Sequence, residues 1–301
     1  MRAAAIIYPR NEHAFDVIDS EEAAYWLGFI AADGSVSSGR LRIGLSSRDA
    51  GHVKKLAAWL APTMPIYAST NNQGKPVTSF EIGSKYLVEA LNAYGIVPRK
   101  TYVMTRLPTV PHSLMKHFLR GYVDADGSFS IRAKEGVIFG VGAFNREIVE
   151  EIQNWFVEEL GVSRTSIICD KGHWRYRQYG SNQVKKIASY LYSDANIYLE
   201  RKYALAQRIL VLDRTALHDH VCEYCGKAFQ APPQNDNARF CSNRCKTTHC
   251  YKSGVDNVTI VCEQCGNEFT RNKYLKRRFC SKRCSALFFH QRMPTRNSTI
   301  L

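Results

Sequence analysis

Two nine-residue segments, residues 26–34 and 119–127, constrain the fold more than any other part of this chain. Each is largely apolar, with glycine at its third position, alanine at its seventh and Asp-Gly at its end. Residues four apart lie on one face of a helix, and small residues at that spacing let two helix backbones approach closely, as in membrane helices. The sequence therefore predicts two short helices packed together, with Asp33 and Asp126 at adjoining ends.

These two aspartates predict a metal site where the helices meet. A helix C-terminus carries partial negative charge and disfavours a carboxylate, so a divalent cation would offset the pairing of Asp33 with Asp126. A single Asp-Gly after an apolar run is ordinarily a helix stop and turn. Here both copies share the glycine at the third position, and serine and a strand-like stretch follow each of them.

At these segments the chain resembles the LAGLIDADG homing endonucleases, which are named after this motif. The eighth position is catalytic in that family, and both copies keep it as Asp33 and Asp126. Copy one departs from the family pattern at Ala31, where the sixth residue is usually acidic. Copy two departs from it at Arg120, the second residue.

Further matching residues indicate that the motifs belong to a longer duplicated unit. Gly-Ser at residues 83–84 recurs at 180–181, and Arg-Lys at 99–100 recurs at 201–202. The resemblance covers roughly residues 20–212. It implies an α+β fold in which two αββαββα copies are related by a pseudo-twofold axis and present antiparallel DNA-binding sheets. We expect the first repeat to span 1–107 and the second to span 108–215.

Alternating residues predict strands with one apolar and one basic face. In residues 39–48, Leu41, Ile43 and Leu45 point one way and arginines and serine the other. Such a sheet can lie against DNA in the major groove, where arginine holds phosphates or reads guanine; an ordinary half-solvated sheet is the alternative. The DNA-contacting residues predicted on these faces are Arg40, Arg42, Ser46, Arg48, Ser130, Arg132, Lys134, His173, Arg175 and Arg177.

Eight of the ten cysteines form a second repeat, with Cys-x-x-Cys followed by Cys-x-x-x-Cys in residues 222–245 and again in 262–284. This spacing predicts one tetrahedral four-cysteine zinc site per copy. Units this short cannot bury a core, so the metal must supply much of the folding energy. Disulfide bonds are the alternative, which a reducing compartment disfavours. The predicted ligands are Cys222, Cys225, Cys241, Cys245, Cys262, Cys265, Cys280 and Cys284.

We expect the two zinc modules at residues 218–254 and 258–296. They resemble the short treble-clef or ribbon modules appended to phage and mobile-element nucleases, which implies a role in extra DNA contact; binding of a protein is the alternative. The basic residues that crowd the loop of the second module, and are predicted to contact DNA, are Lys273, Lys276, Arg277 and Arg278.

The net charge agrees with a nucleic-acid partner. The chain has 41 Lys and Arg against 27 Asp and Glu, a formal charge of +14 at pH 7, which favours a polyanion. Its longest apolar run, residues 23–32, falls short of the roughly 20 residues of a membrane span, and the apolar centre of its first ten residues is too short for a signal peptide. We therefore expect a cytoplasmic protein of a bacterial, phage-infected or organellar compartment, not a secreted one.

The resemblance implies a monomeric, site-specific endonuclease that hydrolyses both strands of a long asymmetric duplex site. Asp33 and Asp126 would hold Mg²⁺ or Mn²⁺, hard ions that prefer oxygen ligands. Lys100 and Lys202 occupy matching places in the two repeats and are predicted to polarise water or to stabilise developing charge. A non-cleaving DNA-binding regulator or an RNA maturase on the same scaffold are the alternatives.

Overall fold

The computed structural model describes residues 8–132, 136–212, 218–231 and 238–291. The chain divides into two compact units, residues 1–213 and 214–301, which are described separately below. Among the described residues, no helix combines the length and apolarity needed to cross a membrane.

The first unit contains two successive copies of one element order. The first copy consists of α1 (Glu21–Asp33), β1 (Ser35–Ser37), β2 (Arg40–Ser46), the 3-10 turn η1 (Ser47–Asp49), α2 (Ala50–Leu60), β3 (Tyr67–Thr70), β4 (Pro76–Gly83), α3 (Lys85–Ala93) and α4 (Lys100–Val103). The second consists of the 3-10 turn η2 (His112–Leu114), α5 (Met115–Asp126), β5 (Gly127–Arg132), β6 (Gly136–Ala143), α6 (Arg146–Leu160), β7 (Ile168–Asp170), β8 (His173–Tyr179), α7 (Ser181–Tyr192) and α8 (Glu200–Val211).

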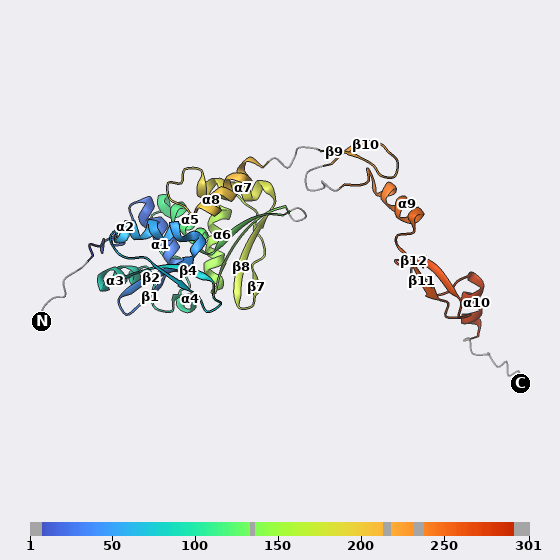
Figure 1. The fold of residues 1–301 in the computed structure, drawn as a ribbon, viewed down its shortest axis with the longest axis horizontal. Helices are drawn as coiled ribbons and strands as arrows, with labels where there is room; N and C mark the ends of the chain where they lie inside the picture. The colour runs from blue at the N-terminus through green and yellow to red at the C-terminus, as the bar shows by residue number, and fades with distance from the viewer. Residues whose placement is uncertain (1–7, 133–135, 213–217, 232–237, 292–301) are drawn as a thin grey trace, which may run out of the picture. The chain divides into compact units, whose positions relative to one another are not determined.

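Each copy forms a four-stranded antiparallel sheet, in the order β1-β2-β4-β3 or β5-β6-β8-β7. The predicted α+β duplication is confirmed, with one helix added at the end of each copy, α4 of 4 residues and α8 of 12 residues. Figure 1 shows α1, α5, α7 and α8 above the strands of this unit. In β2 the side chains of Leu41, Ile43 and Leu45 are buried and those between them are exposed, so the period of two places the apolar face against the helices.

The two copies meet where α1 packs against α5, and this contact requires glycine (Figure 1). A Cβ atom at Gly28 would lie 1.9 Å from the carbonyl oxygen of Phe118. A Cβ atom at Gly121 would lie 1.9 Å from the carbonyl oxygen of Tyr25. The close approach of the two motif helices, predicted from the spacing of small residues, is therefore a reciprocal backbone contact centred on the two glycines.

The second unit repeats a hairpin followed by a helix. Its elements are β9 (His218–Val221), β10 (Ala228–Ala231), α9 (Asn243–Ser253), β11 (Asn257–Val261), β12 (Glu268–Asn272) and α10 (Lys282–His290). Both hairpins are antiparallel, and each helix begins after a serine, Ser242 or Ser281, whose side chain accepts a hydrogen bond from the backbone of the first turn. This is the usual N-cap arrangement, so both helices have a defined start.

Candidate active site and metal centres

Asp33 and Asp126 are the last residues of α1 and α5. The glycine after each has extended backbone and donates its N–H to the helix, so the chain passes from helix into strand within one residue. Desolvation by the surrounding protein, followed by the nearby Asp33 carboxylate, raises the pKa of Asp126 to about 6. The pKa of Asp33 is also raised, by desolvation. The fold therefore holds two like charges together at two helix C-termini, where carboxylates are unfavourable.

Lys100 and Lys202 are buried at these same helix ends, each with 5% of its surface exposed. The ammonium of Lys100 donates to the carbonyl oxygens of Ala31 at 2.7 Å and Ala32 at 2.5 Å. That of Lys202 donates to the carbonyl oxygens of residues 123, 124 and 125, at 2.7, 2.6 and 3.1 Å. Each lysine thus caps the C-terminus of its repeat's motif helix with a positive charge, which stabilises that end.

Both lysines act on both motif aspartates, each more strongly on the aspartate of the other repeat. Burial lowers the pKa of Lys100, and of the two motif aspartates Asp126 opposes that shift more than Asp33 does. Burial lowers the pKa of Lys202 to about 8, and here Asp33 counts for more than Asp126. We call Asp126 with Lys100 the Asp126 centre, and Asp33 with Lys202 the Asp33 centre.

A cavity of about 550 Å³ opens at the Asp126 centre. Asp33, Asp126 and Lys100 line it, together with His173 and Arg175 from the second sheet. A smaller hollow of about 250 Å³ continues from Asp126 past Arg175 and along β8. The structure therefore brings predicted catalytic and predicted DNA-contacting side chains into one open cleft.

Of the DNA-contacting residues predicted in the first unit, all but two lie on its two sheets. Arg40, Arg42 and Ser46 are exposed on β2. Arg48 lies in η1 and not in the predicted strand, because β2 ends at Ser46 and the chain turns into α2. Lys134 lies outside the described residues. On the second sheet, the strand registers place on one face Ser130, Arg132, His173, Arg175 and Arg177.

The two basic faces differ in how their charge is arranged. In the first sheet Arg42 lies opposite Glu81, which forms an ion pair with Arg40 at 2.6 Å. In the second sheet the equivalent strand pair sets Gly140 opposite Arg177. Positive charge is therefore partly neutralised on the first sheet and stands beside glycine on the second.

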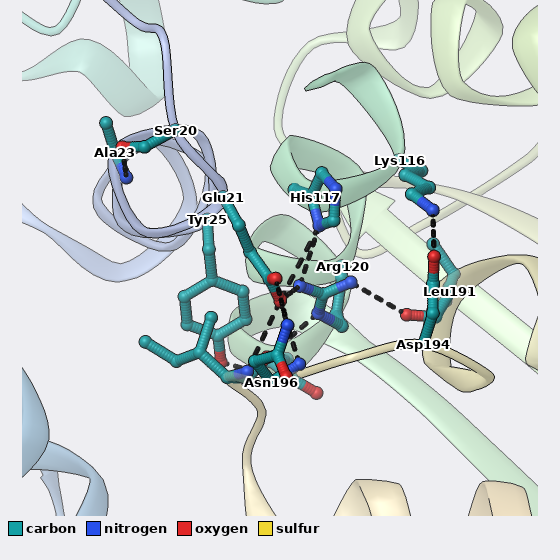
Figure 2. Close-up of polar contacts among 12 residues, drawn as sticks. Ser20, Glu21, Ala23, Tyr25, Lys116, His117, Arg120, Leu191, Asp194 and Asn196 are labelled. Carbon is teal, nitrogen blue, oxygen red and sulfur yellow. Dashed lines mark hydrogen bonds and ion pairs between the residues drawn. The ribbon is translucent and has the colours of Figure 1, made fainter. Parts of the chain in front are cut away.

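Arg120, the departure from the motif in copy two, is a buried residue of the contact between the repeats. Its side chain has 0% of its surface exposed and donates to the carbonyl oxygens of Ile197 at 2.8 Å and Leu191 at 3.1 Å. It also pairs with Glu21, the first residue of α1. Figure 2 shows the Glu21 carboxylate between the guanidinium and Asn196, whose backbone N–H and side-chain amide donate to it at 2.9 and 2.7 Å.

Asp124, the acidic sixth residue kept only in copy two, also joins the repeats. Its carboxylate accepts hydrogen bonds from the hydroxyls of Tyr25 at 2.7 Å and Tyr192 at 2.6 Å, and from the N–H of Leu199 at 2.8 Å. The Tyr25 hydroxyl also contacts Nε2 of His52 at 2.9 Å. Burial raises the pKa of Asp124 against these hydrogen bonds. Sequence reasoning missed the roles of Arg120 and Asp124, although their polarity within apolar segments was a signal.

The eight repeated cysteines form two clusters. Within each, the four Sγ atoms lie within 4.8 Å of one another, and neighbouring Sγ atoms in the two clusters are 3.5–3.6 Å apart. A tetrahedron of Zn–S bonds of about 2.3 Å has edges of about 3.8 Å, so the clusters have the size of a zinc site. The clusters are Cys222, Cys225, Cys241 and Cys245, and Cys262, Cys265, Cys280 and Cys284.

Three of the four basic residues predicted to contact DNA in the second module have partners within it. Lys273 pairs with Asp256 at 2.7 Å, and the Arg277 side chain donates to the carbonyl of Phe279 at 2.8 Å. Arg278 binds the Glu263 carboxylate with two nitrogens. The first module repeats this last pair, since Arg239 donates to both carboxylate oxygens of Glu223 at 2.6 Å. The repetition indicates that Arg278 fastens its loop to the cysteine turn.

Comparison with known proteins agrees with this fold. Residues 113–192 match a family model described as a LAGLIDADG-like domain, which confirms the predicted resemblance there. None of the curated proteins compared with the sequence matches it.

Three solved structures illustrate the likeness. The meganuclease I-AabMI bound to uncleaved DNA is 15% identical, with 62% of this chain and 87% of that chain covered and a TM-score of 0.40. I-SmaMI bound to uncleaveable DNA is 15% identical, with 62% of this chain and 88% of that chain covered and a TM-score of 0.44. The N-terminal LAGLIDADG domain of DUF199/WhiA is 14% identical, with 66% of this chain and 90% of that chain covered and a TM-score of 0.39.

Proposed function

We propose that this chain is a site-specific DNA endonuclease that cuts both strands of a duplex by metal-dependent phosphodiester hydrolysis. The observation that carries the proposal is the pairing of Asp33 and Asp126 at adjoining helix ends, each with its own buried lysine. Two centres in one chain, in repeats that we assign to residues 1–107 and 108–215, fit a monomer acting on two strands.

The donor set fits a hard divalent cation. Asp33 and Asp126 offer carboxylate oxygens, the ligands that Mg²⁺ prefers, and the Asp33 carboxylate raises the pKa of Asp126, a repulsion that a cation would relieve. The two aspartates would hold the ion, which supplies a water of lowered pKa and neutralises charge on the scissile phosphate.

The chain's own residues bind and position the duplex. In the hydrolysis, a water oxygen forms the new bond to phosphorus, the bond from phosphorus to the 3′ oxygen breaks, and that oxygen takes up a proton. Lys100 and Lys202 donate to helix carbonyls, so they fix the carboxylates and add positive charge beside the phosphates. The basic sheet faces, with Arg42 and Arg177 as examples, hold the backbone on either side.

Cleavage selection tests the proposal. The protein would be incubated with Mg²⁺ and a randomised duplex library, and the broken ends sequenced. We expect recurrent double-strand breaks at one long site, lost in the double variant Asp33→Asn, Asp126→Asn. The matched control is Asp194→Asn, which removes an exposed carboxylate paired with Lys116 and should cut normally. Enrichment of a bound site without breaks would contradict cleavage and favour a regulator; preference for structured intron RNA would favour a maturase.

We also propose that residues 218–254 and 258–296 are structural zinc modules, with one ion in each four-cysteine cluster, and that the second contacts DNA. Metal analysis of the purified chain should give two zinc ions, and one each for Cys222→Ser and Cys262→Ser. Lys276 lines a hollow with Arg277 and Phe289, and Lys276→Glu should weaken DNA binding without zinc loss. An unchanged affinity for DNA would contradict this role and favour binding of a protein by the second module.

A further inference from the structure

Asp49 and Asn145 occupy the same place in the two repeats. Each is the N-cap residue of its repeat's second long helix, α2 or α6, and neither uses its side chain to cap that helix. Each side chain instead reaches the segment of the other repeat that carries the buried lysine. Asp49 is a carboxylate that can pair with an arginine, and Asn145 is a neutral amide that cannot, so the two lysine-bearing segments have different ionic partners.

Asp49 forms an ion pair with Arg201, the residue before Lys202. The guanidinium Nε of Arg201 lies 3.1 Å from Oδ1 and 3.0 Å from Oδ2 of Asp49. The Asp49 side chain is only 9% exposed, and of its two arginine partners Arg201 is the nearer, because Nε of Arg48 lies 3.7 Å from Oδ2. Arg201 adjoins the buried Lys202 in α8, and its charge acts against the raised pKa of Asp33, so we assign it to the Asp33 centre.

Asn145 leaves the equivalent arginine unpaired. Its side-chain amide donates to the carbonyl oxygen of Met104 at 2.8 Å, just after the short helix that begins with Lys100. Arg99 precedes Lys100 as Arg201 precedes Lys202, and it lines the cavity of the Asp126 centre together with Asn145. Within the part of the chain that the structure describes, no hydrogen bond or ion pair engages the Arg99 side chain.

The sheets add to this difference. His173 and Arg175 of β8 line the cavity of the Asp126 centre. The strand registers of the first sheet place Val77 and Ser79 of β4 at the equivalent positions. Arg175 does contact Asp170 at 3.3 Å, but both side chains are about half exposed, and such pairs are weak. The Asp126 centre is thus the more positive of the two.

We propose that Asp49 withholds Arg201 from the DNA backbone, and that the Asp126 centre therefore cuts its strand faster than the Asp33 centre cuts the other. The proposal rests on the proposed endonuclease function. The Asp49 carboxylate holds the Nε–H of Arg201 and offsets the charge of its guanidinium, whereas the whole guanidinium of Arg99 can turn toward a phosphate. Asp49 acts through Arg201 and is a positioning residue.

The salt dependence of binding tests the first half of the proposal without any cleavage. Affinity for a mixed-sequence duplex would be measured in EDTA over a range of salt concentrations. Each additional phosphate contact steepens the slope of log K against log salt by about 0.9. Asp49→Asn frees Arg201 and should steepen the slope by about that amount, and Asn145→Asp should make it shallower. Unchanged slopes in both variants would overturn the role of Asp49.

Strand-resolved cleavage tests the second half. The duplex recovered by cleavage selection would carry a different label on each strand. We expect strand rates that differ by about threefold or more, the scale of one exposed ion pair. Asp49→Asn should raise the slower rate toward the faster, and Asn145→Asp should lower the faster one. The control Glu150→Gln breaks the exposed pair with Arg146 and should leave the ratio unchanged.

The outcomes separate the two proposals. Equal strand rates in the unaltered protein, or a loss of both rates by the same factor in Asp49→Asn, would overturn the inequality while leaving the endonuclease intact. A general loss of stability lowers both rates alike and cannot change their ratio. Absence of any cut would overturn the endonuclease and the strand order together, and the slopes in EDTA would still decide the pairing of Arg201.

Discussion

The two repeats share one backbone plan but bury different polar groups. At equivalent positions of α1 and α5 the first repeat has Tyr25 where the second has Phe118, and Ala31 where the second has Asp124. The Tyr25 hydroxyl donates to Asp124 at 2.7 Å, so a donor kept in one copy meets an acceptor kept in the other. Glu21 and Arg120 repeat this relation.

This difference teaches that the contact between the repeats has a symmetric part and an asymmetric part. The glycines of α1 and α5 give the same close approach from both sides. The buried polar pairs do not, because a copy facing its own duplicate would leave a buried charge or hydroxyl without a partner, which is costly. The buried polar contacts therefore require that the two repeats carry different residues at these positions.

The largest effect should come from the symmetric part. Gly28→Val places a side chain where Cβ alone would lie 1.9 Å from the Phe118 carbonyl oxygen. Backbone cannot move aside as a side chain can, so we expect a loss of at least about 4 kcal/mol in the free energy of unfolding. Denaturant unfolding measures it. Gly51→Ala, in α2 with open space around it, is the control and should be neutral or slightly stabilising; equal losses in the two variants would refute the contact.

The asymmetric part should show next. Arg120→Leu gives the second repeat the residue of the first, Leu27, and leaves the Glu21 side chain, 15% exposed, without its guanidinium partner. We expect a loss of about 3–5 kcal/mol. Adding Glu21→Leu, which matches Leu114, should recover part of that loss in a double-mutant cycle. Losses that simply add would show that the pair does not couple the repeats.

A pH-dependent effect separates the repeats further. Burial, assisted by Lys55, lowers the pKa of His52 to about 4, below the unfolded value of about 6.5. Between these values the unfolded chain binds a proton that the folded one does not, so His52 lowers stability as pH falls from about 6.5 to 4. We expect about 2 kcal/mol between pH 7 and 5.

His52→Ile, which copies Ile148 of the second repeat, should remove that contribution. Unfolding free energies of both proteins at pH 7 and 5 provide the comparison. Because other groups titrate equally in both, the difference between the two pH dependences belongs to residue 52. A variant that loses as much stability on acidification as the original would show that His52 is protonated in the fold.

The smallest effect on stability concerns the sheet faces. Glu81→Gln releases Arg40 from an exposed ion pair and should change the free energy of unfolding by no more than about 0.5 kcal/mol. The charge of Arg40 would then no longer be offset by Glu81, and the salt slope of DNA binding should steepen. A change in the free energy of unfolding without a change in the salt slope would show that the Arg40–Glu81 pair affects stability and not DNA binding.

Much of this architecture is predictable from local patterns, because the period of two in strands and the Gly-Ala spacing in helices are short-range signals. The end of β2 is less so: Arg48 continues the alternation, but the chain turns into η1. Lys100 and Lys202 could be found because they recur in the two repeats. Their hydrogen bonds to carbonyl oxygens could not be predicted, because the sequence does not show which side chains lie against the end of a helix.

Long-range partners explain what was missed. Arg120 stood out as a charge in an apolar segment, but Glu21 lies 99 residues away in the chain. Asp49 and Arg201 are separated by 152 residues, and neither departs from an ordinary surface composition. Only the packing of one repeat on the other brings these groups together, and no local pattern encodes that packing.

The two lysine caps also determine when each aspartate–lysine centre can form during synthesis. Lys100 closes a chain of 69 residues back to Ala31, and Lys202 closes one of 79 back to Val123. Chains emerge N-terminus first, so a ribosome that has made only the first seven helices has supplied both aspartates and one cap. An enzyme of the proposed kind would thus have one complete centre until the polypeptide has been made to the final helix of the duplicated unit.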